Sequence, residues 1–202
     1  IGHENGGKKF EEVIEWSYDA NIPFVSFWAL SKENILERSK QELDGIFDIF
    51  RTIFPKLLTL AQSKDIKLES VWDLWLLPPD IRTSLLDAIE KTKNSTKMTV
   101  ILAIAYSGQD EIIRAFRRYI TLGNDVSTLD EKKLLEFLDS GAFPPPDLIV
   151  RTWGAMRHSG YFLYQSAYSE YFFTESLWPD FSHEEFEACL AYFSQTKRNF
   201  WK

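Results

Sequence analysis

The sequence contains only one cysteine and no long apolar run. The first feature argues against a disulfide-stabilised protein, and the second against a membrane-spanning one. A single cysteine, Cys189, cannot form a disulfide within the chain, which argues for a reducing compartment. It lies in the helical pattern of Phe186, Leu190 and Phe193, so we expect it to be buried. No stretch of about 18 apolar residues occurs, and the start, IGHENGGKKF, lacks the apolar segment of a signal peptide. We therefore expect a cytoplasmic protein that contacts membranes only at their surface.

Positive charge is in the minority. The chain of 202 residues has 23 Lys and Arg against 30 Asp and Glu, a formal net charge of -7. This balance argues against a nucleic-acid partner held on a broad basic face, so any anion site must be local. A hydrophobic content of 45%, with 15% aromatic residues, is enough to fill one sizeable core. We expect a single domain over residues 1–202.

Apolar periodicity predicts helices that alternate with strands. The expected strands are continuous apolar runs at residues 24–30, 66–72, 98–106 and 148–150. The expected helices cover residues 10–20, 35–62, a segment from Pro79, 110–119 and 129–138. The long helix at 35–62 is expected to be kinked before Pro55. A last helix should begin at Ser182, which has the spacing of a capping box with Glu185. Continuous apolar strands between helices imply parallel pairing with helices on both faces of the sheet, so the fold class is α/β.

Polar segments follow three of the predicted strands. They are Ser31-Lys32-Glu33-Asn34 with Arg38 beyond it, Ser107-Gly108-Gln109, and the stretch RTWGAMRHS from Arg151 to Ser159. In open α/β sheets, ligands gather at the carboxyl ends of strands, where loops converge and helix N-termini offer N–H groups to anions. The planar forks of Arg151 and Arg157, with the hydroxyl of Ser159, suit a diphosphate. The local sequence leaves a second interpretation open, in which both arginines are ordinary ion-pair partners on the surface.

Three longer segments resemble those of the cis-prenyltransferase family, of the undecaprenyl diphosphate synthase type. The first, GHENGGKKFEEVIEW, is similar to the GHxxG helix of that family, and FWALSKEN is similar to its aromatic-Ala-Phe-Ser-Thr-Glu-Asn segment. The third, DLIVRTWGAMRHSGYFLYQSAYSEYFFTESLWPDF, retains the family pattern R-T-x-G-x-x-R-x-S and the ending L-W-P-D-F. The resemblance is collinear along nearly the whole chain. It implies one α/β domain with a mainly parallel sheet flanked by helices, and an apolar tunnel between the sheet and the long helices.

The resemblance also implies a reaction and its participants. The double bond of isopentenyl diphosphate attacks the allylic carbon of a prenyl diphosphate, Mg²⁺ and cationic side chains stabilise the departing diphosphate, and a Z double bond remains. By motif, the diphosphate of isopentenyl diphosphate would bind Arg151, Arg157 and Ser159. The allylic diphosphate would be approached by His3 and Arg38, and the reacting groups would be oriented by Ser31, Glu33 and Asn34. Glu170 would be a Mg²⁺ ligand, since carboxylate oxygen suits that hard ion.

Further expectations come from the same resemblance. Candidates for the tunnel wall that sets product length are Ala29, Phe47, Phe50, Phe54 and Met98. A homodimer is expected, with contact at a membrane surface for release of the product. The family segment M-D-G-N-G-R, which cradles the allylic diphosphate, is not in this sequence, and we expect it upstream of Ile1.

Local sequence supports plainer roles for several of these residues. Asn34 could simply cap the helix that follows it, and Glu170 could be a solvated partner of an arginine. His158 is expected to be a hydrogen-bonding wall residue, and His183 to lie in the first turn of the last helix. His3, taken alone, could belong to a disordered terminus.

The sequence departs from the family pattern at several positions. Trp153 and Trp72 stand where the family has glycine, Ala155 where an acidic residue is usual, Ala105 for a common Asn and Gln109 for a common Arg. Two function classes follow: an active synthase of a Z-prenyl diphosphate, or a non-catalytic partner subunit of a cis-prenyltransferase complex. A third is a binding protein for polyprenyl phosphates. Retention of Arg151, Arg157, Ser159 and Glu170 favours the enzyme, because a purely structural subunit has little need for a clamp and a metal ligand.

Overall fold

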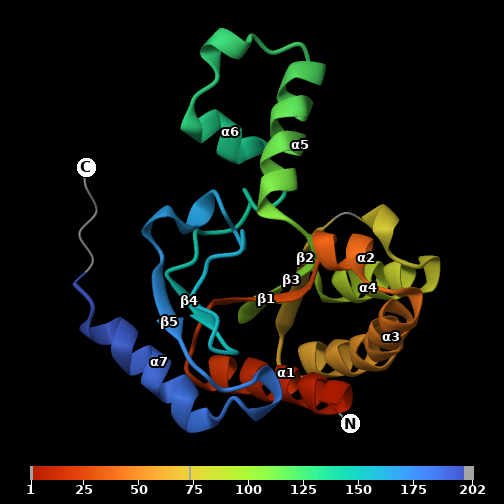
Figure 1. Ribbon diagram of the computed structural model, residues 1–202, viewed down its shortest axis with the longest axis vertical. Helices are drawn as coiled ribbons and strands as arrows, with labels where there is room; N and C mark the ends of the chain where they lie inside the picture. The colour runs from red at the N-terminus through yellow and green to blue at the C-terminus, as the bar shows by residue number, and fades with distance from the viewer. Residues whose placement is uncertain (1, 73, 198–202) are drawn as a thin grey trace.

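A computed structural model describes residues 2–72 and 74–197, apart from the side chains of residues 2–5, 72 and 74. The first half holds α1 (Gly2–Asp19), β1 (Phe24–Ser31), α2 (Lys32–Glu37), α3 (Lys40–Ser63), β2 (Ile66–Trp72), α4 (Pro79–Thr92) and β3 (Met98–Tyr106). The second half holds α5 (Gly108–Thr121), α6 (Glu131–Phe137), β4 (Leu148–Arg151), β5 (Glu170–Phe173) and α7 (His183–Gln195). Short 3-10 turns lie at Leu74–Leu76, Val126–Thr128, Gln165–Tyr168 and Trp178–Asp180. The alternation confirms the α/β class (Figure 1).

The described strands pair in parallel, in two sheets. In the larger sheet β3 lies between β1 and β2, with Phe24 opposite Thr99 on one side and Ile66 opposite Met98 on the other. The smaller sheet pairs β4 with β5. The central position of β3 explains its continuous apolar sequence, because both of its faces and both of its edges are covered.

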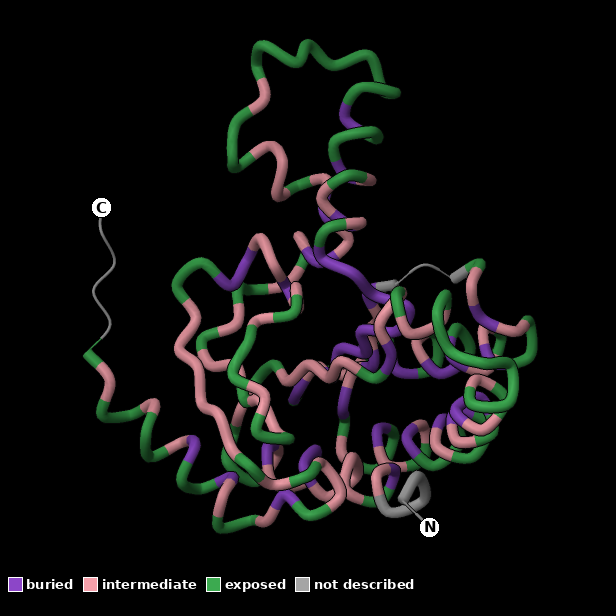
Figure 2. The backbone as a smooth tube through the Cα atoms, in the orientation of Figure 1, coloured by how far each residue is buried: buried purple, intermediate pink, exposed green. Residues whose placement is uncertain are grey.

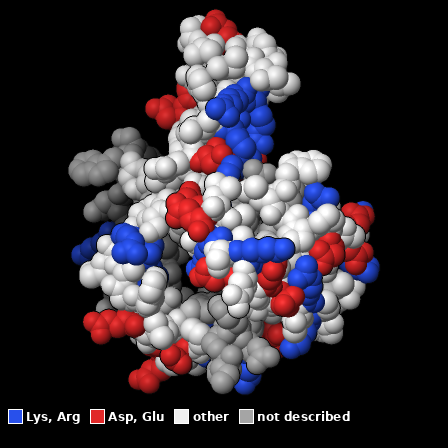
Figure 3. All heavy atoms as spheres, turned by 45° about the vertical axis from the view of Figure 1, so that its right-hand side comes forward, with Lys and Arg blue, Asp and Glu red and all other residues white. Residues whose placement is uncertain are grey.

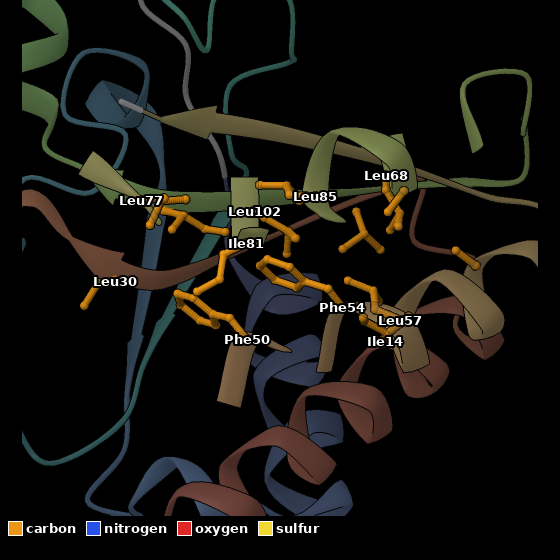
Figure 4. Packing of buried hydrophobic residues seen from close by; sticks show 14 of the residues in the cluster. Ile14, Leu30, Phe50, Phe54, Leu57, Leu68, Leu77, Ile81, Leu85 and Leu102 are labelled. Carbon is orange, nitrogen blue, oxygen red and sulfur yellow. The ribbon is translucent and has the colours of Figure 1, made fainter. Parts of the chain in front are cut away.

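The main core fills the space between the three-stranded sheet and helices α1, α3 and α4. Figure 4 shows Phe50 and Phe54 of α3 extending toward Ile81 of α4 and Leu102 of β3. Buried backbone in Figure 2 is concentrated along these central strands and helices, while the far end of the α5–α6 projection is exposed. This packing buries the whole inner face of α3, as its wide apolar stripe predicted.

The other face of the three-stranded sheet packs against loop residues. Tyr106 and Ile101 of β3 form a buried cluster with Phe162, and Phe143 and Tyr161 pack against it. Helices α5 and α6 instead extend away from the body (Figure 1). The prediction of helices on both faces of the sheet therefore holds for one face of this sheet only, because α5 leaves the end of β3 rather than folding back over it.

Two elements differ from the sequence prediction. The helix expected over residues 35–62 is two helices, because Ser39 begins α3 with a capping box in which its backbone N–H donates to the Glu42 carboxylate at 3.0 Å. Pro55 lies inside α3, which continues to Ser63. Strand β5 was not predicted, since its four residues EYFF are too short to show alternation.

Two further expectations are confirmed. Ser182 and Glu185 form the capping box of α7, and Cys189 on that helix is 1% exposed. Within residues 2–72 and 74–197, no helix combines the length and the apolar character needed to cross a membrane.

Candidate active site

A loop after β4 joins the two arginines and the serine that the sequence singles out. Arg151 is the last residue of β4, and its Nη1 donates to the carbonyl oxygen of Arg157 at 2.7 Å and to Oγ of Ser159 at 2.9 Å. Residues 152–160, here called the clamp loop, therefore curl around the guanidinium of Arg151. The structure thus links Arg151, at the end of β4, to Ser159 and to the backbone of Arg157 on the clamp loop.

The described residues place no carboxylate beside the charges of Arg151 and Arg157. Burial lowers the pKa of Arg151, and the positive charge of Arg157 lowers that pKa further. Among the residues that the structure describes, no Asp or Glu lies within ion-pair distance of either guanidinium. Because Arg remains charged at any physiological pH, two unpaired guanidinium groups side by side favour an anion as their partner. The interpretation of these arginines as ordinary ion-pair partners has no support in the described residues.

The arginines of α5 provide a contrast. Figure 3 shows Lys and Arg gathered on the α5 projection, above a body on which the two charges are interspersed. Arg114 lies 2.6 Å from Asp110 and 2.5 Å from Asp139, and Arg118 lies 2.7 Å from Asp139. These two positive charges are therefore compensated within the chain, whereas the described residues offer no such compensation to Arg151 and Arg157.

The clamp loop has an unusual backbone. Trp153 and Ser159 have positive φ values of 75° and 56°, although neither is glycine. Such conformations are costly for most residues and persist only where the surroundings enforce them. Part of the enforcement comes from the segment after β5: the N–H of Trp153 donates to the carbonyl oxygen of Ser176, and that of Gly154 to the carbonyl oxygen of Thr174.

That segment is in turn fixed to α7. The hydroxyls of Thr174 and Ser176 each donate to the Glu185 carboxylate at 2.6 Å. Glu185 also belongs to the capping box of α7. One carboxylate thus ties the start of the last helix to the segment that supports the clamp loop.

The SKEN segment forms the start of α2 at the end of β1. Ser31 is the N-cap, and its Oγ accepts a hydrogen bond from the N–H of Asn34 at 3.0 Å. The interpretation of Asn34 as the cap of the helix is therefore wrong, because Ser31 has that role. Glu33 and Asn34 lie in the first turn, and Arg38 ends the helix, where its N–H donates to the carbonyl oxygen of Asn34.

All three polar segments expected at strand ends converge. Ser31 lies opposite Tyr106 in the register of β1 and β3, and Lys32 forms a 2.8 Å ion pair with Asp110 at the start of α5. A Cβ atom on Gly108 would lie 2.3 Å from the carbonyl oxygen of Gly160 at the end of the clamp loop. Only glycine permits this approach, so Gly108 determines how closely the clamp loop meets the end of β3.

Sequence reasoning missed a buried carboxylate behind this junction. Glu111 of α5 is 0% exposed, accepts a hydrogen bond from the phenol of Tyr106, and accepts two more from the N–H and the hydroxyl of Ser140. The side-chain amide of Gln165 donates to that same hydroxyl. The only signal in the sequence is a glutamate on the inward face of a predicted helix, which is too weak to distinguish it from a solvated residue.

Glu170 is not brought into the cluster of clamp residues. It pairs with Leu148 at the start of β4, whereas Arg151 pairs with Phe173 at the end. Side chains alternate along a strand, so Glu170 shares a face with Leu148, and Arg151 points to the other face. Within residues 2–72 and 74–197, no group of three or more His, Cys, Asp and Glu could hold a metal ion.

The proposed tunnel residues divide into two sets. Phe47, Phe50, Phe54 and Met98 are buried in the main core cluster, and the rings of Phe50 and Phe54 stack at 5.3 Å. Ala29 is exposed, at a register irregularity of β1. His3 lies in α1, and its side chain is outside the described residues.

Comparison with known proteins agrees with this arrangement. A family model described as "Putative undecaprenyl diphosphate synthase" matches residues 1–201. The chain belongs to this prenyltransferase family. It is 36% identical over 209 residues to isoprenyl transferase 1 of Corynebacterium glutamicum, covering 100% of this chain and 92% of the relative.

Two solved structures of prenyl diphosphate synthases share the fold. A probable undecaprenyl diphosphate synthase from Campylobacter jejuni has a TM-score of 0.87 at 32% identity, covering 98% of this chain and 93% of its own. Lavandulyl diphosphate synthase from Lavandula x intermedia, in complex with dimethylallyl diphosphate, has a TM-score of 0.93 at 29% identity. The match covers 98% of this chain and 87% of the lavandulyl diphosphate synthase chain. The predicted cis-prenyltransferase fold is confirmed.

The departures from the prenyltransferase pattern have structural consequences. Ala105, in place of the common Asn, has a φ of 53°, a conformation that Asn adopts more easily than Ala. Trp153 also has a positive φ where the family has glycine, but its side chain is 68% exposed. The indole therefore extends into solvent.

Proposed function

We propose that this protein condenses isopentenyl diphosphate with an allylic prenyl diphosphate to form a Z-prenyl diphosphate. The observation that carries the proposal is the pair of guanidinium groups of Arg151 and Arg157, for which the described residues offer no carboxylate partner. They lie at the end of β4 and on the clamp loop, which meets the end of β3, in a member of the prenyltransferase family. A diphosphate supplies the charge that this loop lacks. A purely structural subunit would have little need for two like charges held together.

The residues of the chain divide between the two substrates. Arg151, Arg157 and Ser159 bind the diphosphate of isopentenyl diphosphate through charge-assisted hydrogen bonds, which fix the molecule before reaction. His3 and Arg38 approach the allylic diphosphate, and the reacting groups are oriented by Ser31, Glu33 and Asn34. The apolar residues of α3 receive the growing chain. Support for this division comes from the convergence of α2, Gly108 and the clamp loop.

Magnesium is part of the proposal, with Glu170 as its protein ligand. Mg²⁺ is commonly held by one or two carboxylates together with substrate phosphates and water, so a single carboxylate is compatible with it. When bound, the ion would neutralise charge on the departing diphosphate. Because Glu170 and Arg151 point to opposite faces of the small sheet, Glu170 contributes no direct contact to the clamp residues of the same chain.

A homodimer and contact with a membrane surface complete the proposal. Support for the homodimer comes from α5, where Ile113, Phe116 and Ile120 are 50%, 39% and 44% exposed on a helix that projects from the body. Apolar side chains in such a position favour a protein partner. The cytoplasmic setting and the release of product at a membrane surface stay predictions from the sequence.

The test is an assay of the full-length protein, with any residues that precede Ile1 included. Farnesyl diphosphate, labelled isopentenyl diphosphate and Mg²⁺ are incubated with it, and labelled extractable product is measured. The Z geometry of the new double bond is then assigned by NMR. We expect product with the native protein and little with a variant that lacks both Arg151 and Arg157. Absence of labelled product with every divalent metal tried would overturn the proposed activity.

A further inference from the structure

One imidazole lies inside the clamp loop. His158 stands between Arg157 and Ser159, and the N–H of Gly160 donates to its Nδ1 at 2.9 Å. Its Nε2 lies 2.7 Å from Oγ of Ser166, and its ring meets that of Tyr171 edge to face at 5.9 Å. Both ring nitrogens therefore have partners within the protein, so His158 is a structural part of the loop.

These contacts select one tautomer of the imidazole. Because Nδ1 accepts from Gly160, the ring proton belongs on Nε2, which donates to the hydroxyl of Ser166. The hydroxyl of Ser166 donates in turn to the carbonyl oxygen of Leu163 at 3.3 Å. A neutral His158 thus connects the clamp loop to the 3-10 turn at Gln165–Tyr168 by a continuous series of hydrogen bonds.

The turn that His158 holds needs such support. Ser159 and Gly160 have positive φ values of 56° and 89°, and Ser159 must reach the guanidinium of Arg151. A serine in this conformation is strained, so the turn would relax without outside contacts. Relaxation would move the Ser159 hydroxyl and the neighbouring Arg157 away from the position they share with Arg151.

We propose that neutral His158 is a positioning residue for isopentenyl diphosphate. It holds the turn from Arg157 to Gly160 so that both arginines and Ser159 face one diphosphate. Protonation of its ring releases that turn. The proposal rests on the function proposed above. Acid would then weaken the affinity for isopentenyl diphosphate and leave the chemical step unchanged.

The surroundings of the ring explain the direction of this sensitivity. A proton on Nδ1 would face the N–H of Gly160, so two donors would oppose each other. The ring is faced by Arg151 of β4, Tyr171 of β5 and Ser166, with Arg157 next to it in the chain, and the described residues place no carboxylate within ion-pair distance of it. Burial, and then the charge of Arg151, lower the pKa of His158. The imidazole therefore takes up a proton at a lower pH than a free histidine does, and its neutral form is the one favoured at neutral pH.

The test compares two substitutions over a range of about pH 5 to 8, where histidine titrates. In His158→Asn the side-chain oxygen can accept from Gly160 but cannot be protonated, whereas His158→Leu removes the acceptor. We expect His158→Leu to raise the KM for isopentenyl diphosphate about three- to tenfold at pH 8, with kcat and the KM for the allylic substrate unchanged, and the difference from the native protein should shrink as the pH falls. His158→Asn should keep a nearly native KM at pH 8 and rise less than the native protein as the pH falls.

Controls separate this effect from others. The diphosphate itself takes up a proton in this range, and the His158→Asn profile records that contribution alone. His183→Asn, on the exposed histidine of α7, should leave the native profile unchanged. A purely structural role would predict lower thermal stability with no selective change in the KM for isopentenyl diphosphate.

A binding measurement keeps this proposal independent of turnover. Calorimetry with inorganic pyrophosphate should show weaker binding to His158→Leu than to the native protein. If the native protein forms no product while this difference is present, the enzymatic function fails and the role of His158 stands. Equal pyrophosphate affinity in the two proteins, or identical pH profiles for His158→Asn and the native protein, would overturn the role of His158.

Discussion

The phenol of Tyr106 donates a 2.6 Å hydrogen bond to the carboxylate of Glu111, a group with no exposure to solvent. Burial, followed by the charge of Glu111, raises the pKa of Tyr106, so the phenol keeps its proton and acts as the donor. Ser140 supplies two further hydrogen bonds to the same carboxylate. The end of β3, the start of α5 and the segment around Ser140 therefore meet at one buried acceptor.

Removing this acceptor should destabilise the protein. Glu111→Ala would leave the phenol of Tyr106 and the N–H of Ser140 buried without partners, at a cost of about 3 kcal/mol or more in the free energy of unfolding. Urea unfolding followed by circular dichroism measures the loss. Glu90→Ala is the matched control, since its ion pair with Lys93 is exposed and its removal should change the free energy of unfolding by less than about 1 kcal/mol. Equal effects of the two substitutions would contradict the importance of the buried network.

A methyl group at Gly108 should displace the clamp loop. In Gly108→Ala the new Cβ would lie 2.3 Å from the carbonyl oxygen of Gly160, a distance that the backbone must relieve by moving. We expect a higher KM for isopentenyl diphosphate and a lower melting temperature. Gly45→Ala is the control: no atom lies within 4 Å of its Cβ position in α3, so that substitution should stabilise the helix by about 0.5–1 kcal/mol.

Arg157→Ala should selectively weaken the binding of isopentenyl diphosphate. The lost charge-assisted contact should cost about 1.5–3 kcal/mol, seen as a rise of roughly tenfold to a hundredfold in the KM for isopentenyl diphosphate. The KM for the allylic substrate should change much less. Steady-state kinetics with each substrate varied in turn measures both constants, and Lys56→Ala on the exposed side of α3 serves as the charge-matched control. Equal losses for the two substrates would remove Arg157 from the role proposed for it.

The free energy of unfolding should depend on pH through Glu185, at the start of α7. Hydrogen bonds from Ser176, Thr174 and Ser182 lower the pKa of Glu185 below its usual 4.5. A carboxyl group whose folded-state pKa is depressed stabilises the protein above its unfolded-state pKa, and that stability is lost as the pH falls through the folded-state value. The native protein should therefore exceed Glu185→Gln in free energy of unfolding near neutral pH, and the difference should shrink below about pH 4.5. A difference that stays constant between about pH 7 and 3 would exclude the linkage.

Sequence patterns predicted the central elements well and the junctions poorly. Strand β3 is recognisable because its apolar residues are continuous, and α7 because Ser182 and Glu185 have the spacing of a capping box. The break at Ser39 was missed because apolar residues continue on both sides of it. The clamp residues were found by motif, but their shared geometry depends on positive φ values at Ser159 and Gly160, which nothing in local sequence specifies.

The network around Glu111 shows why long-range contacts escape such reasoning. Ser140 is 29 residues away from Glu111 in the chain, in a segment with no periodic pattern. From sequence alone, a single acidic residue on a helix is predicted to be solvated unless its partners are known. Burial of a charged group becomes visible only when the tertiary structure is in hand.

The close approach of Gly108 to Gly160 also has a mechanical consequence. Helix α5 begins at Gly108 and, at 1.5 Å per residue, its 14 residues extend about 21 Å from that contact. A tilt of about 10° at its base would carry the far end through roughly 4 Å. In the homodimer proposed above, a partner bound at the tip of α5 would therefore be sensitive to small movements of the clamp loop at its base.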